Sequence, residues 1–317
     1  MLGYVVEPDS LSLRPILGIP GASTLGPRVE LPAALSRIEM SPAQAQGIVV
    51  SGEGREAGLL RLSDEGAKVL PIEGAAADPQ RIVFSPRGES AVLFFEGSRK
   101  AQVVQGLSAQ PRVEREFDLS TLPGAITTLA TNDKGDVVLA ATAAGESGGA
   151  VYVADRSGTP RFLVAAAATG ISFLAGRSDA ALADAEKDEV LLLEDLSGAF
   201  RVRRLAGPEA GISQPLGVQV TADNQSVVVA NRGAATVTTL SLAGGTAASV
   251  ACACQPTGLY RMAGNAVFRL NEPSREPMYL YDGDSQTPRI VFVPADPETA
   301  VDRSTGPIRT PVHGRSR

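Results

Sequence analysis

The chain has 317 residues, a formal net charge of −6 and a sequence pI near 5.1. An acidic chain has no general attraction to phosphate backbones or anionic lipid headgroups, so we expect neither nucleic-acid nor membrane-surface partners. No run of about 18 apolar residues is present, so no membrane span is expected. Hydrophobic residues make up 44% of the chain, which is enough for a folded core.

The chain enters a strand pattern at residues 3–6, and a second apolar run at residues 11–17 completes a hairpin. This start has neither the basic region nor the apolar core of a signal peptide. We therefore expect a cytoplasmic protein, or an extracytoplasmic one (periplasmic or secreted) if a leader has been removed.

A hairpin of two short β-branched runs around a small polar turn recurs along the chain. The clearest copy begins at Pro215 and runs through Val227-Val228-Val229 to Asn231. The six copies lie at residues 36–50, 81–95, 126–140, 171–183, 215–231 and 258–270. We call these the inner hairpins.

Each inner hairpin is followed by a second, outer hairpin. The outer hairpins lie at residues 59–72, 101–117, 151–164, 190–205, 236–251 and 278–293, with residues 3–17 as a seventh. A repeat of four short strands over roughly 40–46 residues is typical of a blade of a β-propeller. Continuous apolar runs in the inner strands fit strands that are covered on both faces by neighbouring blades.

These repeats predict an all-β protein, a β-propeller in which seven blades are favoured. One blade would be incomplete and built on the N-terminal hairpin, as its outer half, with the inner half missing or partly supplied by residues 307–312. Six blades with an appended hairpin is the alternative. We expect one domain over residues 1–296 and a polar tail at residues 297–317 that contributes to ring closure.

One repeat resembles the YVTN-type repeat of bacterial β-propellers. The matching residues are Pro215, Gly217, Val218, Val220, Thr221, Asp223, Val227, Val229, Ala230, Asn231, Gly233, Thr236 and Val237. Elsewhere the chain is similar only in a looser turn, Phe84-Ser85-Pro86-Arg87-Gly88. The resemblance implies a propeller like those of surface-layer, lactonase-like and NHL-like proteins, often extracytoplasmic, and supplies no catalytic signature.

Few residues offer chemistry. The single histidine, His313, lies outside the repeats, so the ring cannot hold a His-based triad or a His-ligated zinc. Asp184, Glu186 and Asp188 cluster in one connection, either as a solvated acidic loop or as a site for a divalent cation; no other cofactor is expected.

Two other short segments have more than one interpretation. Asn231 and Arg232 end a strand of the best repeat, as turn residues or as ligand contacts. Cys252 and Cys254 would point the same way in an extended strand, roughly 6.5–7 Å apart, so a bridge would need a distorted backbone. We expect structural or free thiols rather than a redox or metal pair, and whether the two are bridged stays open.

The favoured function is a non-catalytic recognition or scaffold module that binds a protein or glycan partner through loops on a rigid ring, as a monomer. The longest irregular connections, residues 18–32, 141–149 and 271–277, are the expected contacts. The alternative is a metal-dependent hydrolase of the lactonase or gluconolactonase type that uses carboxylates at the central channel.

Overall fold

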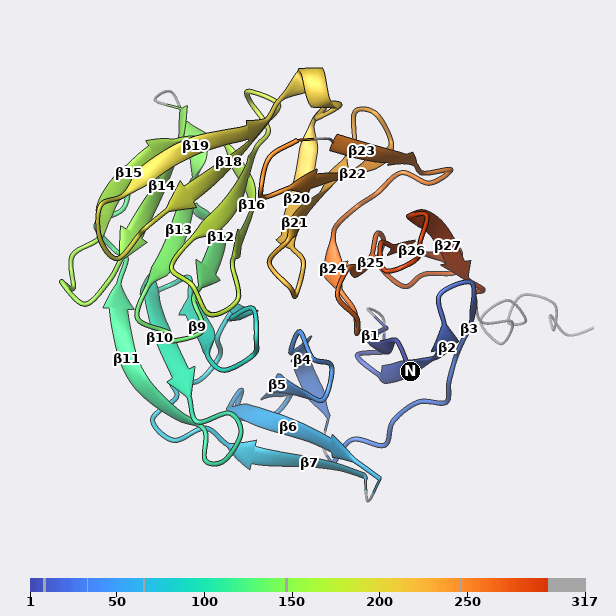
Figure 1. The fold of residues 1–317 in the computed structure, drawn as a ribbon. Helices are drawn as coiled ribbons and strands as arrows, with labels where there is room; N and C mark the ends of the chain where they lie inside the picture. Colours follow the sequence, from blue (N-terminus) through green and yellow to red (C-terminus); the bar gives the residue numbers. More distant parts are fainter. Residues whose placement is uncertain (8–9, 33, 65, 146–147, 246, 296–317) are drawn as a thin grey trace, which may run out of the picture.

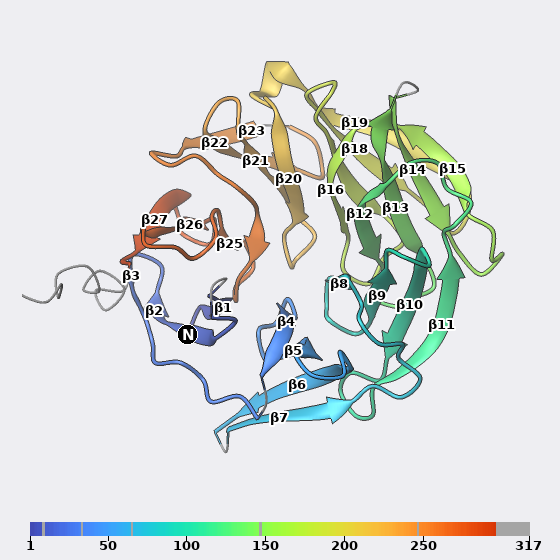
Figure 2. The same cartoon turned by 180° about the vertical axis from the view of Figure 1, so that it is seen from behind.

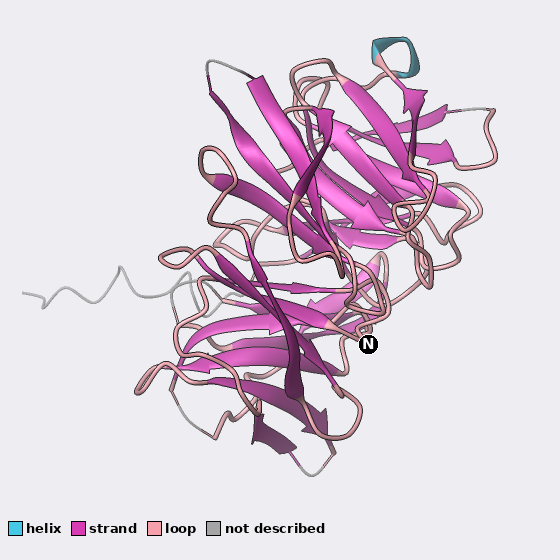
Figure 3. Ribbon diagram, turned by 90° about the vertical axis from the view of Figure 1, so that its left-hand side faces the viewer, coloured by secondary structure: helices cyan, strands magenta, loops and turns pink. Residues whose placement is uncertain are grey.

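The chain forms a ring of seven antiparallel sheets around a central axis (Figures 1 and 2). A computed structural model describes residues 1–7, 10–32, 34–64, 66–145, 148–245 and 247–295. Within these ranges, the 3-10 turn η1 (Pro208–Ala210) is the only helical element, and every sheet consists of strands joined by short loops (Figure 3). The predicted seven-bladed β-propeller is confirmed.

Blades are numbered in chain order. Blade 1 contains β1 (Gly3–Val6), β2 (Leu13–Ile19) and β3 (Ala22–Leu25). Blade 2 contains β4 (Leu35–Met40), β5 (Gln46–Ser51), β6 (Ala57–Ser63) and β7 (Gly66–Pro71). Blade 3 contains β8 (Arg81–Phe84), β9 (Ala91–Phe95), β10 (Lys100–Gln105) and β11 (Arg112–Asp118). Blade 4 contains β12 (Ile126–Thr131), β13 (Val138–Gly145), β14 (Gly148–Ala154) and β15 (Arg161–Ala165).

The remaining blades follow the same order, with the first strand innermost. Blade 5 contains β16 (Ala168–Phe173), β17 (Ala180–Asp184), β18 (Glu189–Glu194) and β19 (Arg201–Ala206). Blade 6 contains β20 (Pro215–Val220), β21 (Ser226–Asn231), β22 (Thr236–Ser241) and β23 (Ala247–Ala251). Blade 7 contains β24 (Tyr260–Arg261), β25 (Val267–Arg269), β26 (Met278–Asp282) and β27 (Arg289–Val293).

Blade 1 is incomplete, as expected, but its missing strand is on the other side. In every blade, the N–H group that follows the first strand donates to the carbonyl five residues later. These bonds are Glu7 to Ser12, Ser41 to Gln46, Ser85 to Ser90, Asn132 to Val137, Leu174 to Asp179, Thr221 to Ser226 and Met262 to Val267. The β1–β2 hairpin is therefore an inner hairpin, and β3 adds a third strand, so among the described residues blade 1 lacks a fourth, outer strand.

The core consists of interfaces between blades. Seven apolar clusters are found among the described residues, and each joins two neighbouring blades around the ring. All five residues of β9 are buried, because they pack between two blades. Blade 1 closes the ring: Val5 and Ile16 pack on blade 7, and Leu13 packs on blade 2.

The turns of the inner hairpins also bind one another at one mouth of the ring. The Asp133 carboxylate of blade 4 accepts hydrogen bonds from the N–H groups of Arg87 in blade 3 (2.8 Å) and Gly176 in blade 5 (2.6 Å). The Asn224 side chain of blade 6 exchanges two hydrogen bonds with the backbone of Ala175 (2.8 and 2.9 Å). The Gln44 side chain of blade 2 accepts from the N–H of Tyr4 (2.8 Å). These bonds fix the angle between successive blades.

Two expected irregular connections are strands instead: β3 lies within residues 18–32, and β13 and β14 occupy most of residues 141–149. Residues 271–277 contain no strand, as expected. The tail at residues 297–317, with its segment 307–312, lies outside the described residues. Its contribution to ring closure and the domain boundary at residue 296 stay predictions.

Candidate functional site

A pocket of about 690 Å³ opens at the mouth where the innermost strands of blades 4, 5 and 6 begin; we call it the rim pocket. Its lining is rich in hydroxyl groups and small side chains, and no acidic residue is among the described residues that line it. The lining residues are Thr127, Thr128, Thr142, Ala143, Ala167, Ala168, Thr169, Ala185, Leu216, Arg232, Gln255, Pro256 and Thr257. The Thr169 hydroxyl donates to the Pro215 carbonyl (2.7 Å), so its lone pairs remain free to accept.

Arg232 and Asn231 have different roles, although they are adjacent in the chain. Arg232 is exposed in the rim pocket, and within the described residues its guanidinium group has no hydrogen bond or ion pair. Asn231 is fully buried, accepts from the Ser213 N–H (3.2 Å) and donates to Thr238 (3.0 Å). A ligand contact by Asn231 stays a prediction that this burial does not favour.

The three acidic residues weighed as cation ligands do not share a site. Asp184 is fully buried, and its Oδ1 accepts from the N–H groups of Ala167 (3.2 Å) and Glu186 (3.0 Å). Asp188 accepts from the N–H of Gln214 (2.6 Å), whereas the Glu186 side chain is exposed. The described residues contain no group of three or more His, Cys, Asp or Glu side chains that could hold a metal. The divalent-cation site and the metal-dependent hydrolase stay predictions without a supporting contact.

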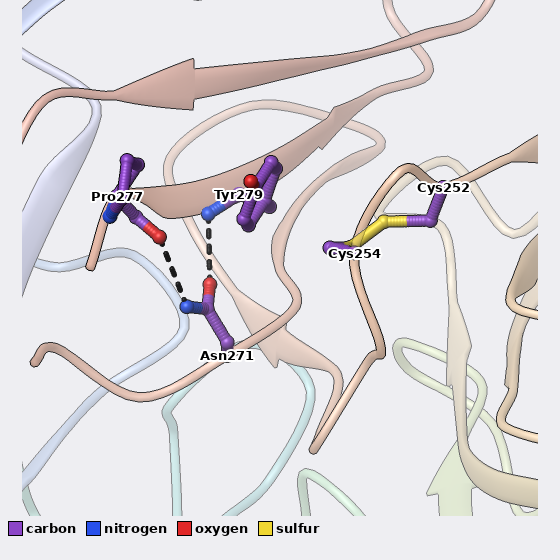
Figure 4. Close-up of a disulfide and its surroundings, with 5 residues drawn as sticks. All are labelled: Cys252, Cys254, Asn271, Pro277 and Tyr279. Carbon is purple, nitrogen blue, oxygen red and sulfur yellow. Dashed lines mark hydrogen bonds between the residues drawn. A yellow bond between two sulfur atoms is a disulfide. The ribbon is translucent and has the colours of Figure 1, made fainter.

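Cys252 and Cys254 form a disulfide, which answers the question that the sequence left open, and they are not free thiols (Figure 4). β23 ends at Ala251, and the chain then bends, which brings the two Cα atoms to 4.9 Å instead of the spacing of an extended strand. Cys252 is buried against blade 7. The disulfide directly precedes the segment from Gln255 to Thr257 that lines the rim pocket.

Reduction of this disulfide should destabilise the protein only slightly, because it closes a very short loop: about 1.5 kcal/mol. Urea unfolding with and without a reductant measures the difference. Thiol labelling of the unreduced native protein should modify neither cysteine, and labelling of both would contradict the bridge.

A second cavity, of about 390 Å³, lies on the ring axis; we call it the central cavity. The hydrogen-bond register of the inner hairpins places one residue of each four-stranded blade at an equivalent position, two residues before the turn. We call this set the axial layer: Glu39, Val83, Ala130, Ser172, Gln219 and Tyr260. All six line the central cavity, and Glu39 is the single acidic residue among them.

Around Glu39, residues of β24, of β25 and of the loop that follows β25 form a polar cluster. The Arg269 guanidinium group donates to Glu272 (2.7 Å) and lies 4.2 Å from the ring centre of Tyr260. Burial and the neighbouring Glu272 raise the pKa of Tyr260 to about 12. Glu39 is exposed to the cavity, but protein surrounds the cavity, and this removal from bulk water raises the pKa of Glu39 to about 7.

No motif or repeat match in the sequence pointed to Glu39, Tyr260, Arg269 or Glu272. A usable signal was present: aligning the six inner hairpins on their turns places an acid at one axial position and small, apolar or neutral polar residues at the others. The copy that carries Glu39 is a weak one, so its positions were not compared with those of the other copies.

Comparisons with known proteins agree on the architecture. No protein-family profile matches the chain, and no curated protein matches it. A functionally unknown protein from Desulfotomaculum acetoxidans is 13% identical, with a TM-score of 0.65 over 93% of this chain and 99% of that one. AztD from Citrobacter koseri is 14% identical, with a TM-score of 0.58 over 90% and 80%. Kuenenia stuttgartiensis hydrazine synthase is 14% identical, with a TM-score of 0.51 over 93% and 96%.

These likenesses show the fold alone. In all, 1161 chains of solved structures resemble this one, so the fold is widely shared and does not select a function. Among the described residues, no helix is long and apolar enough to cross a membrane.

Proposed function

We propose that this protein is a non-catalytic recognition module that binds an anionic group of a protein or glycan partner in the rim pocket. The observation that carries the proposal is Arg232: a guanidinium group without a partner among the described residues, in a pocket walled by hydroxyl groups and free of acidic side chains among its described lining. Guanidinium groups bind carboxylates and phosphates through paired hydrogen bonds.

The surrounding structure supports a preformed site. Thr127, Thr128 and Thr169 come from the innermost strands, and their hydroxyl groups donate to backbone carbonyls of the ring. A site held by a rigid scaffold loses little conformational entropy when it binds. The disulfide supports an extracytoplasmic location, because such bridges persist in oxidising compartments. The YVTN-like repeat at residues 215–237 supports the same location by resemblance.

The test compares Arg232→Ala with wild type in binding to succinate, citrate, galacturonate and inorganic phosphate, measured by calorimetry and thermal shift. At least one anion should bind wild type, and R232A should bind it at least about tenfold more weakly, since a charge-assisted hydrogen bond contributes that much. Arg201→Ala is the matched control: Arg201 is exposed on the outer strand β19, away from the pocket. The proposal fails if no anion binds, or if R232A and R201A bind it equally well.

A further inference from the structure

The central cavity is a second enclosed space, separate from the rim pocket. Its volume of about 390 Å³ falls within the range typical of small-molecule sites, roughly 300–1,000 Å³. Its lining combines polar residues with apolar ones such as Ile82, Phe84 and Leu259, and the polar surface is the larger part. A mixed lining suits a small ligand that carries both a polar group and an apolar part.

The cavity can be reached from the mouth formed by the inner-hairpin turns. A smaller pocket of about 310 Å³ lies among those turns, and it shares Pro42, Pro86, Phe173 and Arg261 with the central cavity. A small molecule can therefore approach the axis from this mouth, whereas the rim pocket lies where the innermost strands begin.

The polar side chains of the cavity differ in whether they already have a hydrogen-bond or ion-pair partner in the protein. The Ser172 hydroxyl accepts from the N–H of Val220 (3.1 Å), and Arg269 is paired with Glu272. The Glu39 carboxylate receives no hydrogen bond and forms no ion pair within the described part of the chain. Glu39 is thus a charged group of the cavity that has no partner among the described residues.

The charges that face Glu39 do not neutralise it. On β4, Arg37 is exposed and has the weakest effect on Glu39 of its charged neighbours. From blade 7, Arg269 attracts and Glu272 repels the carboxylate, and because those two side chains are ion-paired their charges largely cancel. Tyr260 is neutral. Arg261 also lines the cavity, but its guanidinium group donates to the backbone carbonyls of Asn265 and Val220. When Glu39 is ionised, its charge therefore has no paired counter-ion among the described residues, which is costly away from bulk water.

We propose that the central cavity binds a small organic cation, a protonated amine on an apolar body, with its ammonium group on the Glu39 carboxylate. β4 and β24, which carry Glu39 and Tyr260, both lie beside the ring centre (Figure 1). The apolar body packs against the apolar part of the cavity lining, which includes the half-buried Phe84.

Binding of the amine depends on pH in a defined direction. Only the ionised carboxylate attracts an ammonium group, and the enclosed position raises the pKa of Glu39 to about 7. Amine affinity therefore rises as the pH increases through about 7, because the amine itself stays protonated there. In turn, bound amine favours ionisation and lowers the pKa of Glu39.

The experiment uses propylamine, benzylamine and 2-phenylethylamine, each beside the alcohol of the same carbon skeleton, with calorimetry and thermal shift on the full chain. At pH 8.5 at least one amine should bind wild type, while its alcohol binds at least about tenfold more weakly. Glu39→Gln keeps the shape and removes the charge, so E39Q should lose the amine preference and its dependence on pH.

Glu53→Gln, at an exposed loop position, is the matched control and should behave as wild type. Folding raises the pKa of Glu39 to about 7, so above pH 7 the ionised carboxylate costs stability in the folded state. E39Q removes that cost and should unfold at no lower temperature than wild type above pH 7. The proposal is overturned if no amine binds wild type, if amine and alcohol bind equally, or if E39Q binds the amine as wild type does. R232A, which lies at the other mouth, should leave amine binding unchanged.

Discussion

Replacing Asp133 with alanine is expected to lower the free energy of unfolding by about 3–5 kcal/mol, since two charge-assisted hydrogen bonds are lost and two amides lose their partner. The Asp133 side chain is 3% exposed and bridges the backbone of three consecutive blades through Arg87 and Gly176. Equilibrium unfolding in urea measures the loss. The effect should also widen the mouth of the ring, because this carboxylate joins the inner turns of those blades.

Asp133→Asn separates the hydrogen bonds from simple loss of packing. Asparagine keeps the size and retains one acceptor oxygen, so we expect roughly half of the destabilisation of D133A. Glu53→Ala, at an exposed loop position, should change stability by less than about 0.5 kcal/mol. Equal stability of D133A and E53A would show that the bridge between turns contributes nothing.

Replacing Asn231 with alanine is expected to destabilise the protein by about 2–4 kcal/mol, through lost hydrogen bonds and a cavity. The Asn231 amide is completely buried and connects the chain before β20, at Ser213, to β22 at Thr238. Urea unfolding is again the measurement.

Arg232→Ala is the natural comparison for N231A, since its side chain is exposed and has no partner among the described residues. We expect R232A to unfold within about 0.5 kcal/mol of wild type while losing anion binding. If R232A were as unstable as N231A, the division between a structural and a binding residue at this strand end would be incorrect.

The strands were predictable because continuous β-branched runs such as Val227-Val228-Val229 are typical of strands that are buried on both faces. In the structure, this run lies in β21 and is buried between blades. The placement of the N-terminal hairpin was not predictable from its length. In the N-terminal hairpin, the strand pair next to the turn is Val6 and Leu13, which are seven residues apart in sequence. The corresponding pair of an outer hairpin, Asp282 and Arg289, has the same separation. Inner and outer hairpins are distinguished instead by contacts with residues distant in sequence, such as the hydrogen bond from the Tyr4 N–H to the Gln44 side chain.

The candidate sites were only partly accessible from the sequence. Arg232 was found because it follows the best-defined repeat, but the threonines around it come from other blades, up to about a hundred residues away. The disulfide was missed because an extended strand was assumed to continue past Ala251. Glu39 was missed because its meaning depends on comparison with equivalent positions in five other blades.

Ring closure has a consequence for the order in which the protein can fold as it leaves the ribosome. Blade 1 is synthesised before the other blades, yet Val5 and Ile16 pack against Leu280 and Val293, which follow them in the chain by 264 to 288 residues. The apolar residues of blade 1 therefore lack their packing partners in blade 7 during most of translation. Contacts between residues so far apart in sequence also form slowly. The nascent chain is most exposed to misassembly at this first blade, where a chaperone that shields apolar strands would help most.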